Sequence, residues 1–139
     1  MRPGTLPVAL IVALGLAAEI AVRDHARRRE ACRHIRKQAL AALTPLEPRL
    51  TGDRSQVMDH VLNLAFPGLD SEALMVGLKD LIAISNGSAC TSSRYTPSHV
   101  LKAMGLDDDR ANGCVRISWC HLTPPVDWEA VAGRIRSLR

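Results

Sequence analysis

The longest uninterrupted pattern in this chain is a proline-free stretch that runs from residue 8 to residue 43. It predicts one long helix, or two helices joined near Arg23 and Asp24, ending at the Thr44-Pro45 step. Residues 8–21 are apolar almost all round, which is typical of a helix buried against a large surface. The second half is amphipathic with its arginines outward, since its apolar residues recur at helical spacing: Ala31, Cys32, Ile35, Ala39, Ala42 and Leu43.

The rest of the chain predicts short strands that alternate with helices. Strands are expected at residues 57–66, 81–85 and 114–119. Helices are expected after the N-cap Asp70, from Pro97 to Gly105, and over residues 128–138. Residues 107–113 read as a polar connection; the alternative is a calcium loop, but the alternating ligand spacing and the terminal glutamate are missing. This order of elements predicts an α+β fold, a small sheet with helices packed on it.

Size and composition restrict the classes of protein to consider. A chain of 139 residues is one domain's worth, and 47% hydrophobic with 3% aromatic residues predicts an aliphatic interior. The net charge of +4 comes largely from basic residues between positions 27 and 37. Because no aromatic or glycine residues are interleaved with them, a solvated helix face is favoured over a direct nucleic-acid site.

The N-terminus has two interpretations. Met1 to Ala18 contains an early arginine and a 13-residue apolar run from Leu6 to Ala18, which are the parts of a secretory signal peptide. The run is too short to span a bilayer, so no membrane crossing is expected. Pro3 and Pro7 are equally compatible with the start of a buried helix, and Glu19 interrupts a cleavage pattern. The residues alone leave both interpretations open.

The four cysteines are Cys32, Cys90, Cys114 and Cys120, and they show no C-x-x-C pair and no zinc-like spacing with the histidines. We expect no metal site and interpret them as reduced thiols of a cytoplasmic protein. The rival hypothesis is a small secreted domain with two disulfides.

Cys90 lies in an unusual setting, within the small polar run Ser85-Asn86-Gly87-Ser88-Ala89-Cys90-Thr91-Ser92-Ser93. The run forms a loop, residues 85–96, between two segments with the pattern of ordered elements. Cysteine usually prefers burial, so its position among Gly, Ser and Thr is unusual for a core residue. From the residues alone this is either a reactive thiol or a packed cysteine in a turn.

Three motifs resemble one enzyme family. The run from Ser85 to Ser92, followed by Pro97-Ser98-His99-Val100-Leu101 and Gly105-Leu106, is similar to the active-site loop of the cysteine desulfurases, in the branch with a long mobile loop. Val115-Arg116-Ile117-Ser118 resembles that family's arginine strand, and Arg2-Pro3-Gly4-Thr5-Leu6-Pro7 resembles its R-[ST]-G-T segment. The resemblance covers nearly the whole chain, weakens between Arg27 and Val57, and favours a buried helix over a signal peptide.

The resemblance implies a role for three residues. In the family, pyridoxal phosphate holds the substrate L-cysteine, and a loop thiolate takes its sulfur, leaving alanine and a persulfide that passes to a sulfur-acceptor protein. Cys90 matches that nucleophile. Arg116 matches the arginine that holds the substrate carboxylate, although a structural ion pair or a solvent-facing charge is the alternative. Thr5 matches the threonine that contacts the cofactor phosphate from the neighbouring subunit, and helix capping is its alternative. His99 and the three other cysteines are assigned to packing or surface.

The resemblance also implies that parts are missing. A fold-type-I pyridoxal enzyme needs a lysine for the cofactor, an acidic partner and a stacking histidine. The lysines here are Lys37, Lys79 and Lys102, all in helical patterns and none in the family's S-x-H-K context. We therefore expect the C-terminal third of a cysteine desulfurase, from a truncated or split reading frame, that is inactive alone and lacks the lysine anchor.

Two units are expected within this piece. Residues 1–43 would be a long helix or linker that packs on the absent pyridoxal domain, and residues 44–139 a small α+β domain carrying the cysteine loop. The complete enzyme is expected to be a homodimer. The alternative is a non-catalytic sulfur-relay or scaffold module that accepts persulfide on Cys90. Iron–sulfur assembly, tRNA thiolation and DNA phosphorothioation remain open as the destination of the sulfur.

Overall fold

The computed structural model describes residues 4–53, 55–87 and 98–139. Three antiparallel strands form the sheet, in the order β1 (Arg49–Leu50), β2 (Val61–Ala65) and β3 (Cys114–Ser118). The helices are α1 (Val8–Leu43), a 3₁₀ turn at Thr44–Leu46, α2 (Ser71–Leu78), α3 (His99–Ala103), α4 (Asp108–Asn112) and α5 (Trp128–Ser137). The predicted α+β fold, with a long N-terminal helix and a small sheet packed with helices, is confirmed.

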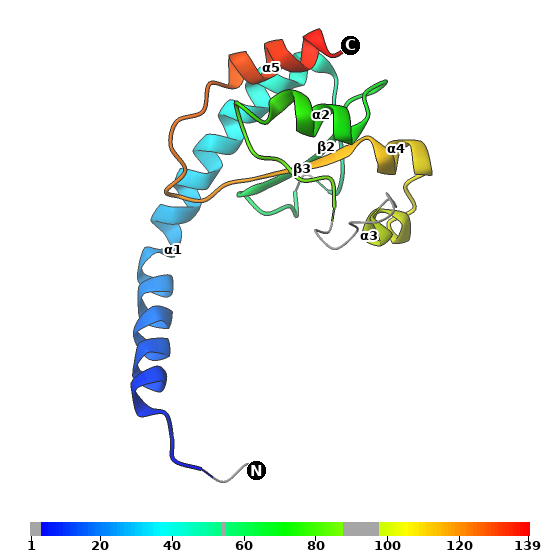
Figure 1. Cartoon of the computed structure of the whole chain (residues 1–139). Coiled ribbons are helices and arrows are strands. Elements are labelled where there is room, and N and C mark those ends of the chain that lie inside the picture. Colours follow the sequence, from blue (N-terminus) through cyan, green and yellow to red (C-terminus); the bar gives the residue numbers. More distant parts are fainter. Residues whose placement is uncertain (1–3, 54, 88–97) are drawn as a thin grey trace.

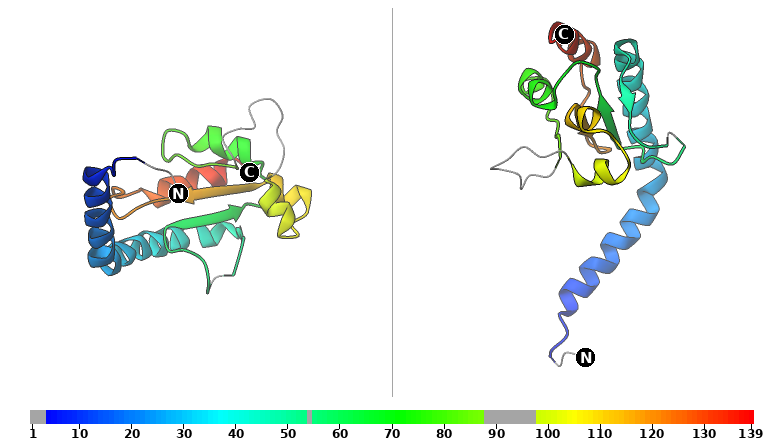
Figure 2. Two further views of the ribbon diagram at one scale, coloured as in Figure 1. Left: turned by 90° about the horizontal axis from the view of Figure 1, so that it is seen from below. Right: turned by 90° about the vertical axis from the view of Figure 1, so that its right-hand side faces the viewer.

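Helix α1 is a single helix of 36 residues, about 54 Å long at the usual rise per residue. Its C-terminal part buries Cys32, Ala39 and Leu43 against the sheet and α5. Its N-terminal part projects away from the sheet and the other helices (Figures 1 and 2). The apolar side chains there are exposed, as Leu10 at 70% and Leu14 at 71% show. Nothing in the described structure covers this half, so its expected packing on a domain outside this chain stays a prediction.

One face of the sheet forms the main core. Because side chains alternate along a strand, Leu62 and Leu64 of β2 share a face with Val115 and Ile117 of β3, and all four are buried. Helices α1, α2 and α5 pack on this face with their own apolar residues. The opposite face carries Asn63 and Arg116 at its centre, and among the described residues a small cluster packs at its end: Ala65, Leu101, Ala111 and Cys114.

Aspartate N-caps start three of the helices. Asp70 accepts the backbone N–H groups of Glu72 and Ala73, as the sequence predicts. Asp127 caps α5 in the same way. Asp107 caps α4 by accepting the N–H of Arg110, so the expectation of a polar connection over residues 107–113 is wrong: a short helix forms there.

Several predicted boundaries also differ from the structure. Strand β2 begins at Val61 rather than at residue 57, and α3 begins at His99, with Ser98 as its N-cap. The expected strand at residues 81–85 is reduced to one bridge, in which Ser85 pairs with Arg116. Gly105 ends the α3 turn with a φ of 80°, in agreement with its predicted role as a helix stop. In the part of the chain that the structure describes, no helix combines the length and apolar character that a membrane crossing needs.

Candidate functional site

Arg116 is the most distinctive side chain on the face of the sheet opposite the main core. It lies in the middle of β3 between the buried residues Val115 and Ile117, and it is itself exposed. Within residues 4–53, 55–87 and 98–139, its guanidinium makes no hydrogen bond or ion pair. The structural ion pair considered as one alternative role is therefore absent from this described part. The exposure of Arg116 agrees both with the other alternative, a solvent-facing charge, and with the predicted binding of a carboxylate, which stays a prediction.

The segment leading to Cys90 leaves the sheet beside Arg116. Ser85 and Arg116 exchange both backbone hydrogen bonds, at 3.0 Å and 2.6 Å. Beyond this bridge the Ser85 hydroxyl donates to the Gly87 carbonyl at 3.0 Å, and the Asn86 side chain contacts Ser71. Cys90 itself lies outside the described residues, so its predicted role as nucleophile stays a prediction. The described structure does bring the start of its loop directly to the predicted carboxylate-binding arginine.

Thr5 lies far from this site. It precedes α1, whose N-terminal part projects away from the sheet (Figure 1), whereas Arg116 belongs to β3. The N-cap position of α1 is Pro7, without a side-chain capping bond, so the capping alternative for Thr5 is not found. One copy of the chain thus does not bring Thr5 and Arg116 together.

The three described cysteines and His99 have the locations expected for packing or surface residues. Cys32 and Cys114 are buried, Cys120 and His99 are exposed, and the three thiols are free. Burial raises the pKa of Cys32 and of Cys114. The pKa of Cys120 is lowered, because the backbone N–H of Leu122 donates to its sulfur. In the described residues no group of three or more potential ligands is arranged to hold a metal ion.

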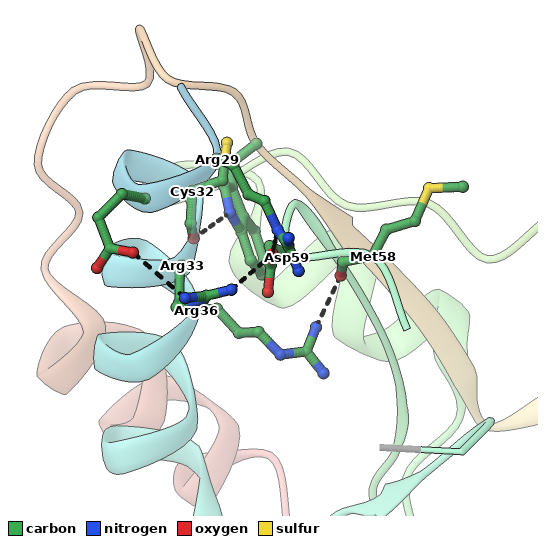
Figure 3. A network of polar contacts seen from close by, with 8 residues as sticks. Arg29, Cys32, Arg33, Arg36, Met58 and Asp59 are labelled. Carbon is green, nitrogen blue, oxygen red and sulfur yellow. Dashed lines mark hydrogen bonds and ion pairs between the residues drawn. The ribbon is translucent and has the colours of Figure 1, made fainter. Parts of the chain in front are cut away.

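The arginines of α1 form a structural network rather than a site. Figure 3 shows Asp59, just before β2, in contact with Arg29 at 2.7 Å and Arg33 at 3.7 Å. Arg36 donates to the backbone carbonyls of Met58 and Val61. These contacts attach the middle of α1 to the chain entering β2, and the Trp119 indole N–H adds a bond to the Cys32 carbonyl at 3.0 Å.

A second group of arginines lies nearer the projecting end of α1. Arg23, Arg27 and Arg28 surround Asp24, and the hydrogen bond from Arg23 is the main reason that the pKa of Asp24 falls to about 2. The predicted solvated arginine face is thus bound in part to carboxylates of the chain itself.

The sequence could not show which residues neighbour Arg116. Asn63 is its cross-strand partner in β2, and Ser85 is its partner on the other side. The only sequence signal for Asn63 is its polar position between Leu62 and Leu64, which places it on the face opposite the core. Register depends on the pairing of distant strands, so the contact itself had no local signature.

Comparison with known proteins agrees with the family indicated by the motifs. A model of the aminotransferase class-V family matches residues 1–131. Cysteine desulfurase IscS from Vibrio campbellii is 38% identical over 136 residues, which are 97% of this chain and 33% of that protein. Among solved structures, DndA from Streptomyces lividans is 42% identical with a TM-score of 0.62, and the match covers 86% of this chain and 33% of DndA.

A solved NifS-like protein is 26% identical with a TM-score of 0.69, over 99% of this chain and 34% of that chain. The chain therefore spans about a third of the length of the relatives that it matches. The family model, the curated relative and the solved structures point in the same direction: this chain belongs to the aminotransferase class-V family and is similar to its cysteine desulfurases.

Proposed function

We propose that this chain is a segment of a cysteine desulfurase that supplies the sulfur-accepting thiol, Cys90, and the substrate-binding guanidinium, Arg116. In the complete reaction the C–S bond of L-cysteine breaks, an S–S bond forms on Cys90, and the carbon skeleton leaves as alanine. The persulfide then passes to a sulfur-acceptor protein. Atoms balance in this exchange without a further oxidant, because the substrate thiol proton and the Cys90 proton remain on the products.

The observation that supports this proposal most is the setting of Arg116. An exposed guanidinium that has no partner among the described residues suits a carboxylate, because its fork of N–H groups can bind both oxygens at once. The backbone pairing of Arg116 with Ser85 starts the Cys90 segment next to it. A substrate held by its carboxylate there would lie near the beginning of a loop that carries a thiol.

Pyridoxal phosphate is the cofactor of the proposed reaction, and the lysines of this chain do not fit its anchor. Lys37, Lys79 and Lys102 are all exposed, and Lys102 pairs with Asp108 at 3.1 Å. Lys37 and Lys79 belong to α1 and to the end of α2, the helices that cover the face of the sheet opposite Arg116. We infer that residues outside this chain hold the cofactor, that the isolated chain is inactive, and that Thr5 serves a neighbouring subunit of a homodimer.

A chimaeric enzyme tests this function. The full 139-residue chain replaces the segment of Vibrio campbellii IscS that it matches, and alanine formation from L-cysteine is measured. We expect activity, its loss in Cys90→Ser, and a KM for L-cysteine at least about tenfold higher in Arg116→Lys because the second hydrogen bond of the fork is lost. Cys120→Ser is the matched control, because it removes another exposed thiol and should leave activity unchanged.

The proposal fails if the Cys90→Ser chimaera retains full activity. A second outcome would also contradict the proposal: the chimaera is inactive, but Cys90 still accepts persulfide sulfur from a separate donor. That result would favour the sulfur-relay module.

A further inference from the structure

The side-chain carbonyl of Asn63 is a buried acceptor without a donor. In the described part of the chain its Oδ1 is shielded from solvent and has no hydrogen-bond partner. A buried acceptor that lacks a donor destabilises the folded state, so native proteins rarely leave one unpaired without a purpose.

The sheet register places this acceptor beside Arg116. Asn63 and Arg116 are direct cross-strand partners. The backbone N–H and C=O of Arg116 are both bonded to Ser85, while the backbone carbonyl of Asn63 accepts from Thr51 at 3.0 Å. Asn63 and Arg116 therefore form the non-hydrogen-bonded type of antiparallel pair, in which the side chains lie on one face and approach most closely, with Cα atoms about 4.5 Å apart.

The Asn63 side chain has an acceptor that lacks a donor, and the Arg116 side chain has donors that lack an acceptor within the described residues. Arg116 has five N–H donors, and none of them has a partner in the described residues. We propose that Asn63 is a positioning residue for Arg116: when the guanidinium turns toward its cross-strand partner, the Asn63 Oδ1 accepts one guanidinium N–H and so orients the fork toward the substrate carboxylate. This inference rests on the proposed function of Arg116, and it goes beyond that function by assigning the residue that sets the direction of the guanidinium.

A neutral acceptor suits this task better than a carboxylate would. An aspartate at position 63 would form an ion pair with Arg116 and cancel the charge that attracts an anionic substrate. The amide carbonyl accepts a hydrogen bond and leaves the full positive charge for the ligand. Asn63 would thus hold the guanidinium in place without competing for its charge.

Nitrogen-15 NMR of the full labelled chain tests the contact, with the Arg116 guanidinium signals assigned from Arg116→Lys. We expect Asn63→Ala to move the Arg116 Nε–Hε signal and to speed its exchange with solvent by about threefold or more, because the acceptor is lost. Asn63→Asp has the same shape and should slow that exchange. Ser118→Ala is the matched control, since Ser118 lies on β3 and is exposed but pairs with Val61.

The Trp119 indole signal reports on the fold, because its N–H donates to the Cys32 carbonyl in the buried core. Arg116 signals that are the same in wild type and in Asn63→Ala, with the Trp119 signal unchanged, would overturn the inference. If Asn63→Ala disturbs the Trp119 signal, the fold has changed and the Asn63→Asp variant is used instead. An Arg116 exchange rate in Asn63→Asp equal to that in wild type would also overturn the inference.

A titration with L-alanine separates this inference from the proposed function. We expect L-alanine to shift the Arg116 signal saturably, with affinity about fivefold weaker in Asn63→Ala. If the Arg116 signal depends on Asn63 but ignores L-alanine, the carboxylate role of Arg116 fails while the contact stands. If L-alanine binds equally well with and without the Asn63 side chain, the positioning role fails while the proposed function stands.

Discussion

Among single side chains, the three described thiols differ in pKa. Burial raises the pKa of a thiol, whereas hydrogen bonds donated to its sulfur lower it. Cys120 is exposed, and its sulfur accepts the N–H of Leu122 at 3.4 Å, with the Thr123 hydroxyl at 3.9 Å. Those donors stabilise a thiolate, so the pKa of Cys120 is lowered. Burial in the core disfavours the thiolate of Cys32 and of Cys114 and raises the pKa of each.

Alkylation should therefore be selective among these three residues. At a pH of about 8, iodoacetamide should modify Cys120 at least about tenfold faster than Cys32 or Cys114, because Cys120 is both more exposed and more ionised. A time course of peptide mass spectra measures the three rates. The rates should converge in denaturant, which is the control. Equal rates in the folded chain would contradict this account of their environments.

At the level of elements, the sequence predicted what depends on local pattern and missed what depends on pairing. The uninterrupted helical spacing predicted α1, and Asp70 predicted the start of α2. Strand β1 has only two residues, too few for any periodicity to show. The polar composition of residues 107–113 concealed α4, which exists because Asp107 caps it and Ala111 buries against the sheet end.

In the candidate site, too, the sequence predicted the features that depend on local pattern and missed those that depend on strand pairing. The position of Arg116 between two apolar strand residues could be predicted from the sequence alone. Its partners Asn63 and Ser85 could not, because each lies more than twenty residues away and is brought in by the sheet register. Resemblance supplied the role expected of Arg116, and only the structure supplied its neighbours.

The ion pair between α1 and the segment before β2 should make stability depend on pH. Arg29 donates to Asp59 and is the main cause that lowers the pKa of that carboxyl, with Arg33 and Arg36 adding to it. Because the pKa of Asp59 is lowered in the folded state, the ion pair stabilises the fold at a pH above the unfolded-state pKa of about 3.9. This stabilisation is lost as the pH falls through the folded-state pKa.

The substitution Asp59→Asn tests that linkage. It should lower the urea midpoint at a pH of about 6, and the difference from wild type should shrink in acid, where the wild-type carboxyl is also neutral. Asp109→Asn is the control, because Asp109 is exposed and no ion pair is found for it in the described residues. A difference between Asp59→Asn and wild type that stays constant with pH would exclude the ion pair as its cause.

At the level of the whole molecule, the most prominent feature is that the two halves of α1 differ in burial. The C-terminal half joins the core, while large apolar side chains remain exposed along the other half: Val8, Leu10, Ile11, Val12, Leu14, Leu16 and Val22. Figure 2 shows this half projecting clear of the sheet and its helices. Apolar surface of this extent is typical of an interface, in agreement with the proposal that further parts of the enzyme are required.

Substitutions on the two halves should therefore have different effects. Leu10→Glu and Leu14→Glu should change the free energy of unfolding by no more than about 0.5 kcal/mol and should reduce self-association, because both side chains are exposed. Leu43→Ala should cost about 2–5 kcal/mol, because Leu43 is fully buried. Urea unfolding and sedimentation velocity measure the two effects. A loss of stability in Leu10→Glu equal to that in Leu43→Ala would show that the N-terminal half belongs to the folded core.

If Cys90 receives sulfur from L-cysteine, the transferred sulfur can be located on that residue directly. The chimaeric enzyme, with this chain in place of the matching segment of Vibrio campbellii IscS, is mixed with less than one equivalent of L-cysteine and trapped with an alkylating agent. Peptide mass spectrometry then locates the added sulfur. We expect one extra sulfur atom on the peptide containing Cys90 and none on the peptides containing Cys32, Cys114 or Cys120. Alanine release with the extra sulfur on another cysteine, or with no sulfur on Cys90, would contradict it.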